Sequence, residues 1–507
     1  MFEQTVQRGL QSGPGLWIKA WRAAKLKKTR AIVCGALILS VFMLFGSPPA
    51  EASYTSASDN PTAASYPSAH NNPTAAHYTS AVYPSPPYPD KPKDIAITFT
   101  NDTLTEKSFT WVTSGTSNSH AFVVVWEADG GVQRLFSGST ETVTGRRDYY
   151  VAPTLFNSPD NVFRFKVNRV TVTGLKPNTG YRYICGDGAA ENWSGEHYFD
   201  TAIESGGFSF IYMTDPQCAV NSQFELWKKC SERAYATFPD AKFIAIAGDL
   251  VDRGSSENLW DKFFYYGDTV LSNLTVVPAV GNHETDTGPH NFSKHFSFPQ
   301  TSHGLPDYVY SFDFGNLHFM VLSTEKTYAQ LTSKNESIRT EANGFLDAQI
   351  NWMREEVSIS QKKWNVVMLH KGIYSGGGYA SSAETLFYRN KLAPVFDELS
   401  IDAVLQGHNH TFDRAYLYDG KSVSGVAAES LSAAKGRGTL YLTANSAGPK
   451  FYPQSNPKPT YLLKHSQPDT QLYTGVTVTD NYMKFDTYTV TDREDGSLFD
   501  TFTVYKQ

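Results

Sequence analysis

The sequence contains little cysteine and no excess of positive charge. Four cysteines in 507 residues are too few for the disulfide framework of a small secreted domain, and they lack zinc-ligand spacing. The net charge is −6 and no basic stripe stands out, which argues against a nucleic-acid partner. Cys34 lies in an N-terminal apolar run, and the spacing of Cys185, Cys218 and Cys230 leaves open whether any two of them pair.

The sequence also lacks an apolar run of the about 20 residues that a transmembrane helix needs. Its longest run, residues 31–45, follows a basic region at 25–30. A Gly-Ser-Pro-Pro break at 46–49 and an Ala-x-Ala cleavage signal at 50–52 come next. We interpret residues 1–52 as a signal peptide and expect a secreted or cell-surface protein. An uncleaved signal anchor is the alternative, and it is the only membrane contact that we expect.

Residues 53–92 have low complexity. They consist mainly of Ser, Ala, Pro, Tyr, Asn and Thr, and the stretch 60–64 is repeated at 72–76. Such a segment has too few aliphatic side chains to bury a core. We therefore predict an extended linker or stalk, followed by at least two domains, because the remaining chain is too long for one ordinary core.

Residues 93–202 contain short alternating strands, including 95–99, 108–112 and 121–126. A strand, a Leu-x-Pro-x-Thr turn and a Tyr-x-Tyr strand follow each other in 169–183. This order resembles the fibronectin type III signature, which implies a β-sandwich. We interpret the domain as a spacer or docking module.

Residues 203–507 change to strand–helix alternation, which is typical of an α/β domain. The predicted buried strands are 208–213, 243–247, 274–280, 317–322, 364–369 and 403–405. The stretch 438–507 is mostly strand-like, and we expect it to complete a second sheet.

Five successive strands of this domain end in side chains that can bind a metal. They are Asp215, Asp249, Asn282, His370 and the pair His408 and His410. Because open α/β sheets bind ligands at the carboxyl ends of their strands, we expect these side chains to converge. Carboxylate, amide and imidazole donors suit Mn, Fe or Zn and do not suit soft metals. Two metals can share one carboxylate, and Asp249 is the natural bridge.

The motifs follow the order Asp-x-x, Gly-Asp-x-x, Gly-Asn-His-Glu, Val-x-x-His and Gly-His-x-His. This order resembles the calcineurin-like metallophosphoesterase superfamily. The preceding fibronectin-like domain and the run 367–370 make the chain most similar to purple acid phosphatases. The resemblance implies an N-terminal β-sandwich followed by a four-layer αββα domain, in an α+β or α/β class.

The resemblance also implies two divalent metal ions, with Mn, Fe or Zn favoured and Ca as an alternative. Carried over by motif, the ligands of the first metal are Asp215, Asp249 and His410. The ligands of the second are Asp249, Asn282, His370 and His408.

The implied activity is that of an acid phosphatase-like phosphoric monoester hydrolase. Metal-bound hydroxide attacks phosphorus, Asp249 and His283 are the catalytic residues, and His283 protonates the leaving alcohol or steadies the transition state. The expected substrate is a phosphorylated small molecule or a phosphoprotein. For Glu284 we leave two interpretations open: it orients an imidazole, or it is a solvated turn residue.

Two positions depart from the family pattern. Purple phosphatases carry Tyr, which binds ferric iron, where this sequence has Asp252. Related divalent-metal enzymes carry His where this sequence has Gln217. We therefore predict a colourless protein with divalent metals and a weaker first site, in which Gln217 is a second-rank candidate ligand through its carbonyl oxygen.

Two further residues are second-rank candidates for substrate contact. Arg253 lies in a Gly-Asp-x-x-Asp-Arg-Gly run that resembles serine/threonine protein phosphatases, where the arginine grips phosphate. A salt bridge at a helix start explains Arg253 equally well. Tyr374 precedes the glycine-rich run 376–378 and would line the pocket, although a plain flexible turn explains this stretch nearly as well.

Two alternative functions stay open. A phosphodiesterase would use the same ligands with different pocket walls. A non-catalytic surface protein would present the phosphoesterase fold on the stalk, and the departures at Gln217 and Asp252 are its support.

Overall fold

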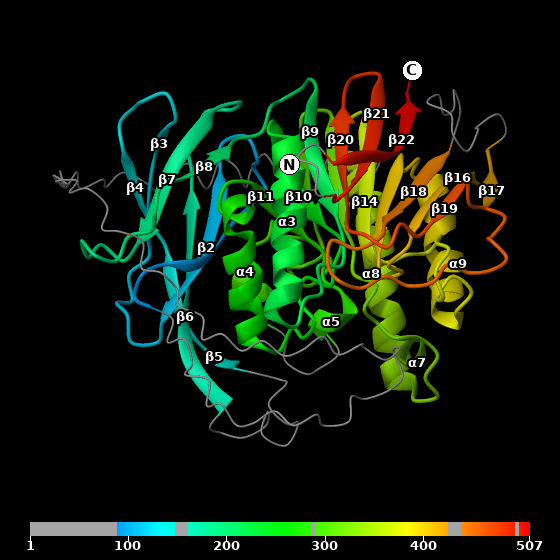
Figure 1. Cartoon of the computed structure of the whole chain (residues 1–507), viewed down its shortest axis with the longest axis horizontal. Coiled ribbons are helices and arrows are strands. Elements are labelled where there is room, and N and C mark those ends of the chain that lie inside the picture. The colour runs from blue at the N-terminus through cyan, green and yellow to red at the C-terminus, as the bar shows by residue number, and fades with distance from the viewer. Residues whose placement is uncertain (1–88, 148–160, 286–290, 424–437, 492–495, 507) are drawn as a thin grey trace, which may run out of the picture. The chain divides into compact units, whose positions relative to one another are not determined.

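The structure is a computed structural model that describes residues 89–147, 161–285, 291–423, 438–491 and 496–506. All of them belong to one compact unit, Ala75–Gln507 (Figure 1). The predicted signal peptide and nearly all of the predicted linker lie outside the described residues. Export, the linker and the domain bounds therefore stay predictions. None of the described helices is both long enough and apolar enough to span a membrane.

The first part of the described chain is a β-sandwich, as predicted. One antiparallel sheet has the order β1-β2-β6-β5, with β1 (Lys93–Thr98), β2 (Lys107–Ser114), β5 (Ser139–Arg146) and β6 (Val162–Val172). The other has the order β4-β3-β7-β8, with β3 (Phe122–Glu127), β4 (Arg134–Ser137), β7 (Gly180–Gly186) and β8 (His197–Asp200). Inward-facing residues of both sheets, such as Phe109, Val123 and Tyr183, form one buried core.

The second part of the described chain contains two larger sheets. The six-stranded sheet has the order β11-β10-β9-β20-β21-β22. Its strands are β9 (Phe208–Met213), β10 (Ala241–Ile246), β11 (Thr275–Pro278), β20 (Leu472–Val478), β21 (Tyr482–Thr489) and β22 (Ser497–Tyr505). The first three are parallel to one another, and β20 to β22 continue the sheet in antiparallel fashion.

The eight-stranded sheet has the order β12-β13-β14-β15-β18-β16-β17, and β19 pairs with β16. Its strands are β12 (Tyr310–Phe314), β13 (Leu317–Val321), β14 (Trp364–Lys371), β15 (Ala403–Gly407), β16 (Phe412–Tyr418), β17 (Lys421–Ser422), β18 (Thr439–Ala444) and β19 (Lys464–Ser466). Strands β13, β14, β15 and β18 are parallel, so their carboxyl ends lie at one edge of the sheet.

Helices cover the outer faces of the two sheets (Figure 1). The described helices are α3 (Asn221–Thr237), α4 (Glu257–Leu271), α5 (Asn282–Thr285), α6 (Phe292–His295), α7 (Tyr328–Leu331), α8 (Glu336–Ile359) and α9 (Ala383–Glu398). Apolar faces of α3 and α4 pack on the six-stranded sheet, and those of α8 and α9 pack on the eight-stranded sheet. Phe210, Phe243 and Phe319 belong to the core between the sheets. The predicted αββα layering is confirmed.

The C-terminal stretch differs from the prediction in one respect. Residues 438–507 do not build one sheet, because β18 and β19 join the eight-stranded sheet while β20 to β22 extend the six-stranded sheet next to β9. Strand periodicity indicates the strands of this stretch, but it does not identify a strand's pairing partner. The C-terminal stretch therefore contributes strands to both sheets of the second domain.

A buried lysine links the sandwich to the second domain. Lys107, on β2, has no exposed surface and donates a hydrogen bond from Nζ to Thr275 Oγ1 on β11, at 3.0 Å. Its ammonium also lies 4.3 Å from the centre of the Phe99 ring. Burial lowers the pKa of Lys107 to about 7, although Asp200 opposes the shift.

We expect this lysine to make the free energy of unfolding depend on pH. The unfolded chain binds a proton at Lys107 up to its ordinary pKa near 10.5, while the folded protein releases it near 7, so stability rises with pH between these values. Urea unfolding should show a gain of about 2 kcal/mol from pH 7 to pH 9 that Lys107→Met removes. Lys176→Met, which removes an exposed lysine of the sandwich, is the control. An unchanged slope in Lys107→Met contradicts the prediction.

Candidate metal centre

Strand ends bring the predicted ligands together between the two sheets. Asp249, at 2% exposure, follows β10 in a left-handed backbone conformation with φ of 50°. Gly281 packs against it so closely that a Cβ at position 281 would lie 2.2 Å from Asp249 Oδ1. The backbone N–H of His283 donates to the same oxygen, at 2.9 Å. The Asp249 carboxylate is therefore held by the turn that carries Asn282 and His283.

Glu284 anchors this arrangement, and neither interpretation from the sequence is right. Its side chain is fully buried and accepts hydrogen bonds from the backbone N–H groups of Asp249 (3.0 Å), Leu250 (2.9 Å), Val251 (3.3 Å) and Gly281 (2.8 Å). Burial and the nearby Asp249 carboxylate raise the pKa of Glu284 to about 8, while the backbone donors favour its ionised form. Glu284 is thus neither solvated nor bound to an imidazole.

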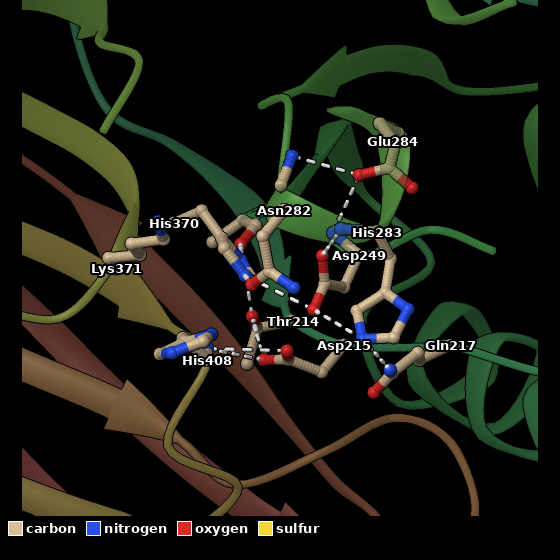
Figure 2. Close-up of polar contacts among 12 residues, drawn as sticks. Thr214, Asp215, Gln217, Asp249, Asn282, His283, Glu284, His370, Lys371 and His408 are labelled. Atoms are coloured by element: carbon tan, nitrogen blue, oxygen red, sulfur yellow. Dashed lines mark hydrogen bonds and ion pairs between the residues drawn. The ribbon is translucent and has the colours of Figure 1, made fainter. Parts of the chain in front are cut away.

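One group of potential ligands comprises Asp249, His370 and His408, whose ligand atoms lie within 4.8 Å of one another. His370 Nε2 lies 3.1 Å from Asp249 Oδ2 and 3.1 Å from Asn282 Oδ1. Figure 2 shows His370 and His408 on one side of Asp249, and His283 and Gln217 on the other. This group corresponds to the predicted second metal site.

The other group of potential ligands comprises Asp215, Asp249 and His410, whose ligand atoms also lie within 4.8 Å of one another. His410 Nε2 lies 3.2 Å from Asp215 Oδ1. Asp215 is fully buried and accepts a hydrogen bond from the His408 N–H, at 2.9 Å to Oδ2. This group corresponds to the predicted first site, and Asp249 belongs to both groups.

The donor set fits a metal ion on two counts. His370 Nδ1–H donates to the Ala247 carbonyl and His410 Nδ1–H donates to the Lys450 carbonyl, each at 2.8 Å, so both rings present Nε2 to the centre. Metal-binding histidines are usually oriented by such a hydrogen bond. In addition, Gln217 is 1% exposed, and its buried Oε1 has no hydrogen-bond partner among the described residues. An amide oxygen of this kind can satisfy a metal, so Gln217 remains a candidate ligand.

The backbone is strained where these side chains emerge. Asp215, Gln217, Asp249, His408 and His410 all have positive φ, between 39° and 70°. Residues other than glycine rarely adopt this conformation, and such strain is concentrated at functional sites. The conformation aims successive side chains of a short turn toward one point instead of along a strand.

Charges at the centre are strongly coupled. Burial disfavours the charged form of Asp249, but His370 and His283 outweigh it and hold the pKa of Asp249 below its usual range. Burial also opposes the charging of His370, yet Asp249 raises the pKa of His370 to about 10. Burial and the His370 charge together lower the pKa of His408. The centre therefore pairs buried carboxylates with positive charge, a role that bound cations can also fill.

The two departures from the family pattern are neighbours in the structure. Gln217 Nε2 lies 3.4 Å from Asp252 Oδ1 and contacts His283 Nε2. Asp252 Oδ1 in turn accepts a hydrogen bond from Lys450 Nζ, at 2.6 Å. Asp252 thus forms an ion pair with Lys450, a residue that sequence reasoning missed because it lies 198 positions away.

His283 lies at the edge of the centre and is partly exposed, at 24% of its side chain. Its Nδ1–H donates to the Asp252 carbonyl at 2.7 Å, which leaves Nε2 facing Asp249 Oδ2 at 4.0 Å. The ring is therefore held in a defined orientation beside both ligand groups. Its catalytic role stays a prediction.

The two second-rank candidates for substrate contact, Tyr374 and Arg253, differ in their burial. Tyr374 is 5% exposed and packs against Tyr441, Tyr461 and Arg389, so it is a core residue and not part of the pocket wall. The prediction for Tyr374 is corrected on this ground. Arg253 is half-buried next to Asp252, and its role stays a prediction.

Two tyrosines that sequence reasoning missed lie over the ligand histidines. The Tyr379 ring is 4.7 Å from the His408 ring, and the Tyr452 ring is stacked 4.4 Å from the His410 ring. Tyr379 directly follows the glycine run 376–378, which was the only signal for it in the sequence.

Comparison with known proteins agrees with this fold. Residues 208–412 match the family model of the calcineurin-like phosphoesterases, which defines the class of the second domain. Residues 92–201 match the model of the purple acid phosphatase N-terminal domain. The chain therefore combines a calcineurin-like phosphoesterase domain with a purple acid phosphatase N-terminal domain, and the resemblance identified from the motifs is confirmed.

Curated relatives and solved structures point the same way. Purple acid phosphatase 21 of Arabidopsis thaliana is 26% identical over 49% of this chain and 53% of its own length, so the chain matches about half of that relative. Acid phosphatase type 7 of Danio rerio is 24% identical over 69% of this chain and 77% of its own length. Purple acid phosphatase PPD1 from yellow lupin shares the fold, with a TM-score of 0.66, 18% identity, and coverage of 82% of this chain and 75% of that one.

We expect Glu284→Gln to destabilise the protein. The amide group of glutamine would face backbone N–H donors and leave at least one of them unpaired, at a cost of about 2–3 kcal/mol. Urea unfolding in the presence of a chelator measures this cost apart from any metal effect. Glu341→Gln, which changes an exposed carboxylate (73%) paired with Lys326, should cost less than about 1 kcal/mol. Equal effects in the two variants contradict the anchoring role of Glu284.

Proposed function

We propose that this chain is an exported phosphomonoesterase that uses two divalent metal ions. The observation that carries the proposal is the position of Asp249, whose carboxylate belongs to both ligand groups. A carboxylate shared by two groups suits a pair of metals roughly 3.5–4 Å apart, the spacing used in phosphatases. The family of the second domain supports the same class of reaction.

The roles of the ligands follow from their positions. Asp215 and His410 would hold the first ion, and His370, His408 and Asn282 the second, with Asp249 between them. Oxygen and nitrogen donors favour Mn, Fe or Zn, with Ca as the alternative. When bound, the two ions supply an activated water and neutralise charge on the phosphoryl group.

His283 is the candidate proton donor to the leaving alcohol. Its Nδ1–H is engaged by the Asp252 carbonyl, so Nε2 is the atom that faces the centre. The His283 side chain is partly exposed, at 24%, and its Nε2 also contacts Gln217 Nε2. A proton delivered from Nε2 to the ester oxygen would stabilise the departing alkoxide.

The first site is proposed to be the weaker one. Asp252 occupies the position of the iron-binding tyrosine. Its carboxylate forms an ion pair with Lys450, so we do not expect it to bind the metal. Gln217 offers one neutral oxygen in place of a histidine. Without a phenolate from position 252 the ferric state loses its main support, so we expect a colourless protein.

Two other functions stay open. A phosphodiesterase would use the same ligands, because the distinction rests on the pocket walls. A non-catalytic surface protein is favoured only by the altered first site. For each of these functions, the proposed substrate or ligand is a phosphorylated small molecule or a phosphoprotein.

The proposal is tested by hydrolysis of a generic aryl phosphate and of the corresponding bis-ester. Protein comprising residues 53–507 and the full chain are both stripped of metal and refilled with Mn, Zn, Fe or Ca. We expect metal-dependent release from the monoester, and we expect Asp249→Asn to abolish it, because one carboxylate serves both ligand groups.

Three outcomes would change the assignment. Faster turnover of the bis-ester identifies a phosphodiesterase. Turnover that survives in Asp249→Asn places the activity elsewhere. No turnover with any metal, in protein that is folded by circular dichroism, supports the binding role.

A further inference from the structure

The mouth of the metal centre is bordered by the two aromatic rings of Tyr379 and Tyr452. Each ring lies over one ligand histidine, with centroid distances of 4.7 Å and 4.4 Å, and each is half-buried. The two rings are 6.3 Å apart and inclined by 64° to each other. Since each tyrosine covers a histidine and also keeps exposed surface, the pair lies between the ligands and solvent. We call these two residues the aromatic rim.

The backbone of the rim is firmly held. The Gly376 N–H donates to Asp413 Oδ2 at 2.8 Å, and Ser455 Oγ donates to the Gly376 carbonyl at 2.6 Å. Gly377 packs on the Asn409 carbonyl so tightly that a Cβ would lie 2.9 Å from that oxygen. The glycine run therefore fixes the position of Tyr379 over His408, and it is not a plain flexible turn.

Tyr452 is fixed from the other side. Its N–H donates to the His410 carbonyl at 3.2 Å, and Gln467 Nε2 donates to the carbonyls of both His410 (2.6 Å) and Tyr452 (2.7 Å). The two tyrosines come from separate loops, and the Ser455–Gly376 hydrogen bond joins these loops. The rim is thus built before any substrate arrives, which lowers the entropy lost on binding.

The phenol groups of the rim have no structural task. Neither hydroxyl makes a hydrogen bond within the part of the chain that the structure describes, although Tyr183, Tyr212 and Tyr388 each donate one to a backbone carbonyl. Buried tyrosines normally find such a partner, so unengaged hydroxyls indicate that these rings meet solvent or a ligand. The charge next to the rim is also balanced, because Lys450 is paired with Asp252.

We propose that the aromatic rim selects phosphate esters whose alcohol carries a planar aromatic ring close to phosphorus. This inference rests on the proposed phosphoesterase function. With the phosphoryl group at the metal centre, the organic group points outward past Tyr379 and Tyr452, where a planar ring stacks on their faces. Each aromatic pair contributes about 0.5–1.5 kcal/mol beyond its buried area, which corresponds to roughly 2–12-fold in affinity.

The test compares benzyl phosphate with cyclohexylmethyl phosphate. Both are esters of primary alcohols with similar size, so the main difference between them is the planar aromatic ring. For the wild-type protein we expect kcat/KM for benzyl phosphate to be about 10-fold higher, mainly through a lower KM. Tyr379→Leu and Tyr452→Leu should each reduce this ratio, and the double variant should bring it near 1.

Conservative variants and a second readout separate stacking from structural damage. Tyr379→Phe and Tyr452→Phe keep the rings and should keep the ratio. Inhibition by inorganic phosphate, which lacks an organic group, should change little in Tyr379→Leu. If Tyr452→Leu loses bound metal, the Tyr379→Leu and Phe variants still decide the question.

The outcomes distinguish the inference from the function on which it rests. Hydrolysis of both esters with a wild-type ratio near 1, or a high ratio that survives in the double Leu variant, overturns the rim proposal alone. A ratio that falls in the Phe variants assigns the effect to the hydroxyls and also overturns it. Hydrolysis of neither ester overturns the phosphomonoesterase function itself.

Discussion

The structure depends on how the Asp249 carboxylate is held between two groups of ligands. Two buried carboxylates, Asp249 after β10 and Glu284 in α5, lie on adjacent turns, which is unfavourable unless each finds compensating partners. Glu284 finds them in four backbone N–H groups, and Asp249 finds them in His370 and in the His283 N–H. The backbone that results is left-handed at Asp249 and leaves room only for glycine at Gly281.

The departures at Gln217 and Asp252 form one linked change. A carboxylate at position 252 would add negative charge beside Asp249, and Lys450 compensates for it with an ion pair at 2.6 Å. The same lysine orients His410 through its backbone carbonyl, so the ion pair and the first ligand group share one residue. Gln217, between Asp252 and His283, contributes an amide that carries no charge. Compared with the family pattern, the first ligand group thus lacks the tyrosine of position 252 and has an amide next to it where related enzymes have an imidazole. Asp215, Asp249 and His410 still lie close enough together that they could hold a metal ion.

Much of the fold was predictable because buried strands can be recognised from their apolar composition. The predicted strand at 208–213 is β9 residue for residue, and helix α3 buries Phe224, Trp227, Cys230 and Ala234 as their spacing indicates. The ligands were predictable because each one lies at, or a few residues after, the carboxyl end of a strand. Glu284, Tyr374 and Lys450 were not, since their roles depend on contacts with distant parts of the chain. Tyr374 and Tyr379 lie on the same glycine-rich loop, and only the packing of that loop on Asn409 shows which one reaches the site.

The number of divalent metal ions bound per chain tests the central claim most directly. Native mass spectrometry of protein refilled with Mn or Zn should show two ions in the wild type. Asp249→Asn should weaken both sites at once, because one carboxylate serves both groups. Asp252→Asn changes a neighbouring carboxylate outside both groups and should retain two ions. A wild-type chain that binds one ion or none, or an Asp249→Asn variant that still binds two, would contradict the shared-carboxylate account.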